Sequence, residues 1–115
     1  MNNIDIPILK KTQDLYKVFH DYRKVVPKTE RYTIYERCEC LIINLLEYFF
    51  QAGFEKSAQK ILALEKASVQ LNMLRFFVRL MKDTKTFDNK KYLVLQAIID
   101  EIGRMLGGWI RSTRE

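Results

Sequence analysis

Glycine, proline, histidine and cysteine are scarce in this chain of 115 residues, which has four, two, one and two of them, respectively. Few glycines and prolines mean few turns, so long regular elements are expected. One histidine, His20, and two cysteines, Cys38 and Cys40, are too few ligands for a zinc site within one subunit. On a helix the two cysteines would point about 200° apart, which excludes a disulfide between them there. We interpret them as small core or interface residues in a reducing compartment, and His20 as a surface residue.

Long apolar runs are also missing. No run approaches the roughly 18 residues that a membrane span requires. The closest stretch, residues 41–50, is interrupted by Asn44 and Glu47, and the N-terminal MNNIDIPILKK lacks the apolar core of a signal peptide. We therefore expect a cytoplasmic protein. Because 48% of the residues are apolar, the chain is not of the disordered class, and its length suits one domain with a small core.

The patterns that carry catalysis are absent from the sequence. There is no glycine-rich phosphate loop and no Glu-x-x-His motif of a di-iron bundle. A nucleophile pair between His20 and a cysteine has no supporting residue. The carboxylates that share helices are interpreted as charged faces: Glu36, Glu39 and Glu47 on one, and Asp100 and Glu101 on another. We predict a protein that is not an enzyme and needs no cofactor or metal, with a carboxylate-cluster enzyme as a remote alternative.

Apolar residues recur at helical spacing in four stretches separated by short polar connections. The predicted helices cover residues of about 6–25, 30–53, 57–82 and 88–111. Short connections between long helices favour antiparallel neighbours. The sequence therefore predicts an all-α fold, an antiparallel up-down-up-down four-helix bundle, as a single domain over residues 1–115.

Helix boundaries are marked by capping residues and by Pro27, which pushes the residue before it out of the helical region. Candidate N-caps are Asp5 for the first helix, Thr29 or Thr33 for the second, and Asp88 or Thr86 for the fourth. Thr33 is followed three residues later by Glu36, which is the spacing of a capping box.

The last predicted helix combines a regular apolar face with three glycines. The face has steps of four, three, four and three residues: Leu95, Ile99, Ile102, Leu106 and Trp109. Each of Gly103, Gly107 and Gly108 costs a helix interior roughly 0.5–1 kcal/mol relative to alanine. Gly103 and Gly107 share a face, where another backbone can come close; alternatively, Gly107 and Gly108 end the helix. The residues from 111 onward are expected to form a frayed basic tail.

The third predicted helix has two apolar stripes on nearly opposite faces. One consists of Leu64, Leu71, Leu74, Val78 and Met81, and the other of Leu62, Val69, Met73, Phe76 and Leu80. The outer helix of a monomeric bundle needs only one stripe. The second stripe therefore predicts a homo-oligomer, with an interface formed by Leu62, Val69, Met73, Phe76 and Leu80 together with Gly103, Gly107 and Trp109.

The net charge is +6, from 20 basic and 14 acidic residues, which favours an anionic partner such as nucleic acid or a membrane surface. The candidate binding cations lie on or beside the last three predicted helices: Arg37, Arg75, Arg79, Lys82, Lys90, Lys91, Arg104 and Arg111. Arginine forks pair well with phosphate, and a ring of identical subunits multiplies the field. Tyr32, Tyr35 and Tyr92 are the aromatic candidates for stacking on bases, although core packing is favoured for each.

Several short segments occur in one order along the chain: Ile6-Pro7-x-x-x-Lys-Thr12, Arg31-Tyr-Thr-Ile34, Leu74-Arg75 with Arg79-Leu80, and EIGRMLGGW at residues 101–109. This ordered set resembles the accessory variability determinant family of diversity-generating retroelements, over nearly the whole chain. The C-terminal segment is the most specific of the four.

The resemblance implies a four-helix bundle that assembles as a basic homopentamer without catalytic activity of its own. Its implied partners are the reverse transcriptase of the element, the template RNA and the cDNA, which it serves in mutagenic retrohoming. The resemblance points to Arg75, Arg79 and Arg104, which lie in matched segments; Lys82, Lys90, Lys91 and Arg111 are added from charge alone. The alternative is a related bundle of the kind encoded in ribosomal RNA intervening sequences, acting as a protein-interaction module without a nucleic-acid role.

Overall fold

The computed structural model describes residues 6–115, which form helices joined by short turns. The elements are α1 (Ile6–Asp21), a 3₁₀ helix η1 (Tyr22–Val25), α2 (Lys28–Arg31), α3 (Ile34–Phe54), α4 (Ser57–Asp83) and α5 (Asn89–Arg114). Residues 6–115 contain no strand, and the predicted all-α class is confirmed. Among these residues no helix combines the length and apolarity that crossing a bilayer requires.

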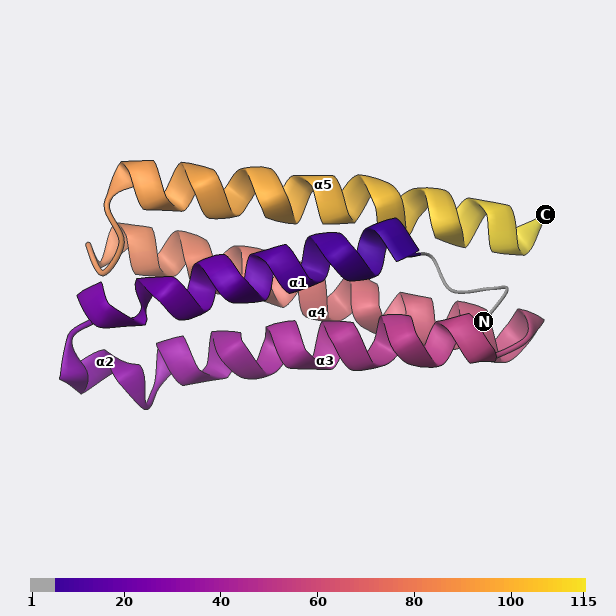
Figure 1. Cartoon of the computed structure of the whole chain (residues 1–115), viewed down its shortest axis with the longest axis horizontal. Helices are drawn as coiled ribbons and strands as arrows, with labels where there is room; N and C mark the ends of the chain where they lie inside the picture. Colours follow the sequence, from indigo (N-terminus) through magenta and orange to yellow (C-terminus); the bar gives the residue numbers. More distant parts are fainter. Residues whose placement is uncertain (1–5) are drawn as a thin grey trace.

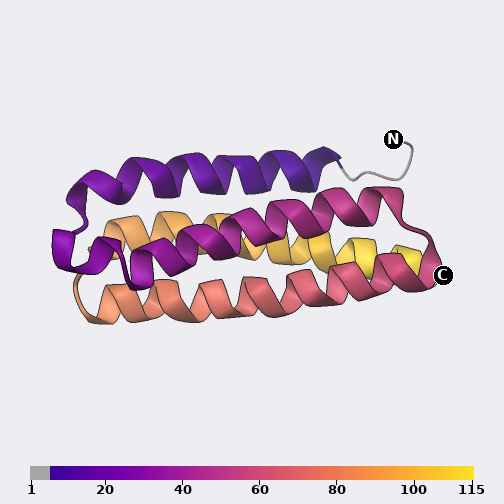
Figure 2. The same ribbon diagram turned by 90° about the horizontal axis from the view of Figure 1, so that it is seen from below.

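The four long helices lie side by side along the longest axis in Figure 1, within an envelope of 44 × 22 × 19 Å. The helix α3 packs on α4, α4 packs on α5, and α1 packs on both α3 and α5. Residues 22–33 and the turn at residues 84–88 lie together at one end in both views (Figures 1 and 2), and we call this end the α2 end. The turn between α3 and α4 lies at the opposite end.

The core lies between the long helices and consists of the stripes that the periodicity predicts. On α1 the residues Thr12, Leu15 and Phe19 are at most 1% exposed. On α5 the predicted face is buried from Leu95 to Trp109, whose ring is 6.4 Å from that of Phe49 between centroids. Trp109 is therefore a core residue of its own subunit, which corrects its assignment to an oligomer interface.

The connection between α1 and α3 differs from the single break predicted at Pro27. The predicted first helix extends to residue 25, but its last turn is the 3₁₀ helix η1, and the predicted helix at 30–53 is divided into α2 and α3. The hydroxyl of Tyr35 donates a hydrogen bond to the carbonyl of Phe19, and the two rings stack with their centroids 4.5 Å apart. Because Tyr35 is 0% exposed, this contact ties the start of α3 to the end of α1 and excludes the tyrosine from base stacking.

The capping box predicted at Thr33 does not form. Thr33 is the N-cap of α3, but its hydroxyl accepts no hydrogen bond from the first turn of the helix, and it donates to the carbonyl of Glu30 at 3.3 Å. Thr29 lies within α2, and Asp5 lies outside the described residues.

The prediction of Asp88 as an N-cap is confirmed, since its carboxylate accepts a hydrogen bond of 2.8 Å from the backbone N–H of Lys91. Thr86, the alternative cap, is buried and donates to the carboxylate of Glu30 at 2.7 Å. This bond joins the α4–α5 turn to α2, so the two parts of the α2 end are held together.

The helix α4 has the two apolar faces that the sequence predicts. One face is buried and consists of Leu64, Leu71, Leu74, Val78 and Met81, none of which is more than 3% exposed. On the other face Phe76, Val69 and Leu62 are 65%, 58% and 48% exposed, respectively. Leu80 is also exposed, and Met73 is partly covered.

The helix α5 continues through all three glycines to Arg114, so Gly107 and Gly108 do not end it. The residues predicted to be a frayed tail are the last turn of this helix, and the guanidinium of Arg114 lies 2.6 Å from the carboxylate of Glu65. This ion pair joins the end of α5 to α4.

Candidate functional site

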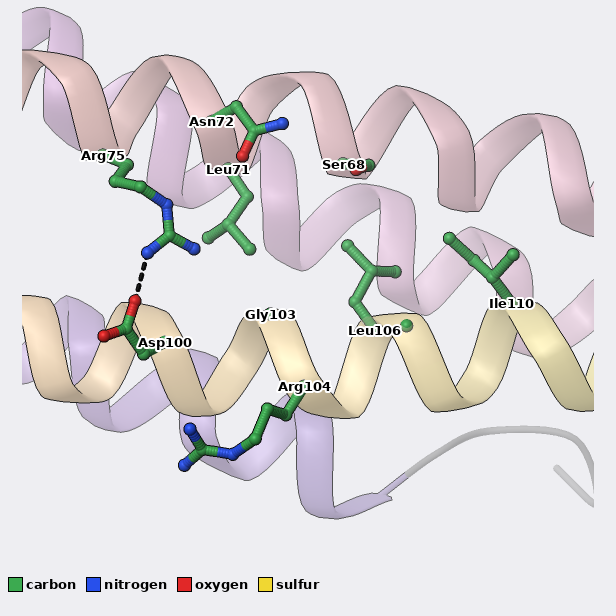
Figure 3. A pocket seen from close by; sticks show the side chains of 10 residues that line it. Ser68, Leu71, Asn72, Arg75, Asp100, Gly103, Arg104, Leu106 and Ile110 are labelled. Atoms are coloured by element: carbon green, nitrogen blue, oxygen red, sulfur yellow. Dashed lines mark hydrogen bonds and ion pairs between the residues drawn. The ribbon is translucent and has the colours of Figure 1, made fainter.

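A groove between α4 and α5 contains a pocket of about 430 Å³. Figure 3 shows that Ser68, Asn72 and Arg75 border it from α4, while Asp100 and Ile110 border it from α5. Leu71 on α4 also lines the pocket, so the groove has polar and apolar residues on both walls. It contains two of the three positions to which the family resemblance points.

Arg75 reaches across this groove, where its guanidinium donates to the carboxylate of Asp100 (Figure 3). The side-chain amide of Gln96 also donates to Asp100, at 3.4 Å. Gly103 leaves room for the arginine, because a Cβ at this position would lie 3.3 Å from Nη2 of Arg75 and 3.7 Å from the side chain of Leu71. The glycine thus accommodates a side chain of α4, whereas the sequence suggested a neighbouring backbone.

A second pocket of about 380 Å³ continues the groove toward the α2 end, sharing Asn72 and Arg75 with the first and adding Phe76, Arg79, Tyr92 and Gln96. The ammonium of Lys82 is 4.8 Å from the centroid of the Tyr92 ring, a cation–π distance. Within residues 6–115, Oε1 of Gln96 is buried and accepts no hydrogen bond. Such an atom offers an acceptor to a ligand that brings a donor.

The three arginines to which the resemblance points do not converge on one spot. Arg75 and Arg79 line the groove, and hydrogen bonds to Asp83 and Tyr92 raise the pKa of Arg79 above its usual value. Arg104 borders the first pocket, but its side chain extends away from α4 in Figure 3 and its guanidinium donates to Glu101.

The remaining predicted cations lie around the molecule. Arg37 is exposed on α3, away from the groove, and Lys90 is exposed in the first turn of α5. Lys91 lies 3.5 Å from Asp88. Arg111 covers the glycines near the end of α5, since a Cβ on Gly107 would lie 3.4 Å from its Nη1.

Several predicted cations thus have an acidic partner within their own chain: Arg75, Arg79, Arg104 and Lys91. Each pair is at least partly exposed, and exposed pairs contribute little because water screens them. A phosphate is a strong competitor for an arginine fork in such a pair. The pairs therefore weaken the local field without removing the cations from reach.

Two parts of the exposed apolar surface bear on the interface prediction. The first is the outer face of α4 around Val69 and Phe76. The second is an apolar hollow of about 510 Å³ between α1 and α3, lined by Leu9, Leu46 and Phe50 with polar neighbours. Gly103 and Gly107 belong to neither part, because they line the groove between α4 and α5.

A cationic pocket that the structure has at the α2 end was not predicted from the sequence. It has a volume of about 400 Å³ and is lined by His20, Asp21, Arg23, Lys24 and Arg31. The basic run RKVVPKTER at residues 23–31 was the available signal, but the pocket depends on the turn through η1 and α2, which the helix prediction did not contain.

The described part of the chain shows no arrangement for metal or thiol chemistry. Within residues 6–115, no group of three or more histidine, cysteine, aspartate or glutamate side chains is placed to hold a metal ion. Burial raises the pKa of the Cys38 thiol to about 12, which keeps it protonated and unreactive at neutral pH. Cys40 is exposed on the other side of α3.

Fold and surface together define a class: a four-helix bundle whose distinctive surfaces are a groove bordered by arginines and an uncovered apolar face. Residues 6–113 match the model of the bAvd-like family, and the chain belongs to this family. Comparison with curated proteins gave no match.

Proposed function

We propose that this chain is a non-enzymatic accessory subunit of a diversity-generating retroelement. In this role a single-domain, antiparallel up-down-up-down bundle binds the reverse transcriptase of the element together with template RNA and cDNA, and supports mutagenic cDNA synthesis in the cytoplasm. The family match over residues 6–113 is the observation that carries the proposal. The order of the sequence colours along neighbouring helices in Figure 1 supports the antiparallel arrangement.

The homo-oligomer that belongs to this proposal, a pentamer by the resemblance, is supported by the outer face of α4. Phe76 and Val69 expose more than half of their surface along a continuous stripe. Contiguous apolar patches on the surface of a soluble protein mark interaction sites. We therefore retain Leu62, Val69, Met73, Phe76 and Leu80 as the proposed interface.

The anionic partner is supported by the distribution of charge among the helices. Each of α4 and α5 has five basic and two acidic residues, whereas α3 has one basic and three acidic residues. The basic helices are those that border the groove. Arg75 and Arg79 therefore face a ligand that enters it, and their forks suit phosphate oxygens.

The proposal is tested by replacing these two arginines together, as Arg75→Gln with Arg79→Gln. The double variant should bind template RNA several-fold more weakly in fluorescence anisotropy at low salt. For a single strand, the slope of log affinity against log salt should fall by about 0.7 for each lost phosphate contact. Unchanged affinity and slope would remove both arginines from the site.

The matched control is Lys10→Gln with Lys56→Gln, which removes the same charge from exposed positions away from the groove. Neither lysine has an ion pair within residues 6–115. The control variant should retain both the affinity and the salt slope of the unmodified chain. Absence of RNA binding by the unmodified chain at physiological salt would favour the interaction module without a nucleic-acid role.

A further inference from the structure

Most of the positive charge of the molecule lies at the α2 end. Residues 17–40 and 79–91 contain 11 of the 20 basic residues and 6 of the 14 acidic residues. This excess of five makes up most of the net charge of +6. Both segments meet at this end in Figures 1 and 2, where the ring of Phe87 packs edge-on against that of Phe19 at 5.9 Å between centroids. The positive field of a single subunit is therefore directed along the bundle axis.

The cationic pocket at this end has weakly engaged cations. Nη1 of Arg23 is 3.9 Å from the carboxylate of Glu39, and Nζ of Lys24 is 3.8 Å from that of Asp21. Both distances are at the outer limit of an ion pair; the Lys24–Asp21 pair is exposed and contributes little, and the Arg23–Glu39 pair is half-buried. An incoming anion can therefore displace these partners at small cost.

Arg31 is the best-oriented cation of the pocket. Its Nε donates to the carbonyl of Val26 at 2.9 Å, which fixes the plane of the guanidinium. Within residues 6–115, no hydrogen bond engages its two terminal amino groups. A fixed guanidinium with free terminal donors is the geometry with which arginine binds phosphate.

An exposed aromatic ring lies beside the pocket. The side chain of Tyr32 is 71% exposed, more than any other large apolar or aromatic side chain among the described residues. The guanidinium carbon of Arg23, which lines the pocket, is 5.8 Å from the centroid of this ring. An exposed tyrosine next to phosphate-binding cations is the arrangement on which the bases of single-stranded nucleic acids stack.

We infer that the pocket at the α2 end binds a phosphodiester of single-stranded nucleic acid, and that Tyr32 stacks on the adjacent base. The inference deepens the proposed function and rests on it, because it assigns the nucleic acid a site at the end of the bundle in addition to the α4–α5 groove. The exposed ring beside the cations favours a nucleic acid over an anion without bases, because the ring has nothing to offer phosphate alone.

The experiment measures binding of a fluorescent oligothymidylate and of an abasic oligonucleotide of equal length, by anisotropy over a series of salt concentrations. Tyr32→Ala should weaken binding of the oligothymidylate about tenfold and leave the abasic strand unaffected. Tyr32→Phe should restore the loss, since it keeps the ring. Arg23→Gln with Lys24→Gln should weaken both strands and lower the salt slope by about 1.4.

The control is Lys10→Gln with Lys56→Gln, which should change neither strand. Arg31 is left intact because its bond to Val26 holds the turn, and circular dichroism checks that each variant is folded.

If Tyr32→Ala and Arg23→Gln with Lys24→Gln bind both strands like the control, while the unmodified chain binds both strands, the inference is overturned and the proposed function stands. If Arg23→Gln with Lys24→Gln weakens binding of both strands but Tyr32→Ala has no effect on either, the stacking of Tyr32 on a base is overturned. If the unmodified chain binds neither strand, both proposals fail.

Discussion

Gly103 is the residue of α5 at which an added side chain would crowd Arg75 of α4. A Cβ here would lie 3.3 Å from the end of the Arg75 side chain, whereas a Cβ on Gly108 would meet its nearest neighbour, Arg111, only at 3.9 Å. Both glycines lie inside α5, where glycine is costly relative to alanine. Substitution of Gly108 therefore measures the cost of glycine in a helix alone, whereas substitution of Gly103 also measures the effect of the contact with Arg75.

Gly108→Ala should raise the free energy of unfolding by about 0.5–1 kcal/mol, because it meets no close contact and improves helix propensity. Gly103→Ala should stabilise less, because the guanidinium of Arg75 has to move aside. Urea denaturation of both variants measures the difference. Equal stabilisation would show that Arg75 does not need the space at Gly103.

Asp88 is the residue with the clearest link between pH and stability. Its pKa is lowered, mainly by the hydrogen bond from the backbone N–H of Lys91. Because the folded state holds the ionised form, its stabilising effect is present above the unfolded pKa of about 3.9 and is lost as the pH falls through the lower folded pKa.

Asp88→Ala should therefore lower the Tm at pH 7, and the difference from the unmodified chain should shrink once the pH falls below about 4. Thermal melting followed by circular dichroism at several pH values measures this. Asp21→Ala is the control, because the Asp21 side chain caps no helix. A difference that stays constant down to pH 2 would be incompatible with a carboxylate cap at this helix.

Among the elements, α4 is the one whose role is least explained by a lone subunit. Its inner face is part of the core, while its outer face leaves Phe76 and Val69 in water. Core packing therefore does not account for the exposed side chains of α4, which are Leu62, Val69, Phe76 and Leu80. These side chains are the structural basis for the proposed oligomer.

Phe76→Gln with Val69→Gln should leave the bundle folded, since surface substitutions usually change stability by less than about 0.5 kcal/mol. The same variant should lower the mass of the assembly in sedimentation equilibrium. The control is Leu93→Gln with Val94→Gln, which removes two exposed apolar side chains from α5. An unaltered assembly mass in the first variant would exclude the outer face of α4 from the interface.

Apolar periodicity in the sequence predicted some features of the helices and not others. Both stripes of α4 and the face of α5 were predictable, because helical spacing fixes which residues share a face. The division of the second predicted helix was not, because the backbone leaves the helical region at Thr33, with φ −122° and ψ −104°, and apolar spacing does not report such a local change. The pocket formed by Arg23 and Arg31 was missed for the same reason, since the turn through α2 creates it.

At the scale of the whole molecule, the positive charge is concentrated at the α2 end, and the outer face of α4 adjoins the groove at Phe76. The α2 end holds most of the net charge, the α4–α5 groove is bordered by paired arginines, and the outer face of α4 is apolar. The pairing of Arg75 with Asp100 was beyond sequence analysis, because the two residues are 25 positions apart on different helices. Phe76 belongs both to the outer face of α4 and to the second pocket of the groove, whereas the residues that line the pocket at the α2 end lie on other elements.

The most direct measurement is analytical ultracentrifugation of the chain with fluorescent template RNA, recorded at low and at high salt. We expect the RNA to sediment at low salt with a protein species several times the mass of one chain. At high salt the RNA should be released while the protein assembly persists, because apolar contacts resist salt and phosphate contacts do not. A protein that sediments as a single chain, with the RNA free at low salt, would contradict the proposed accessory role.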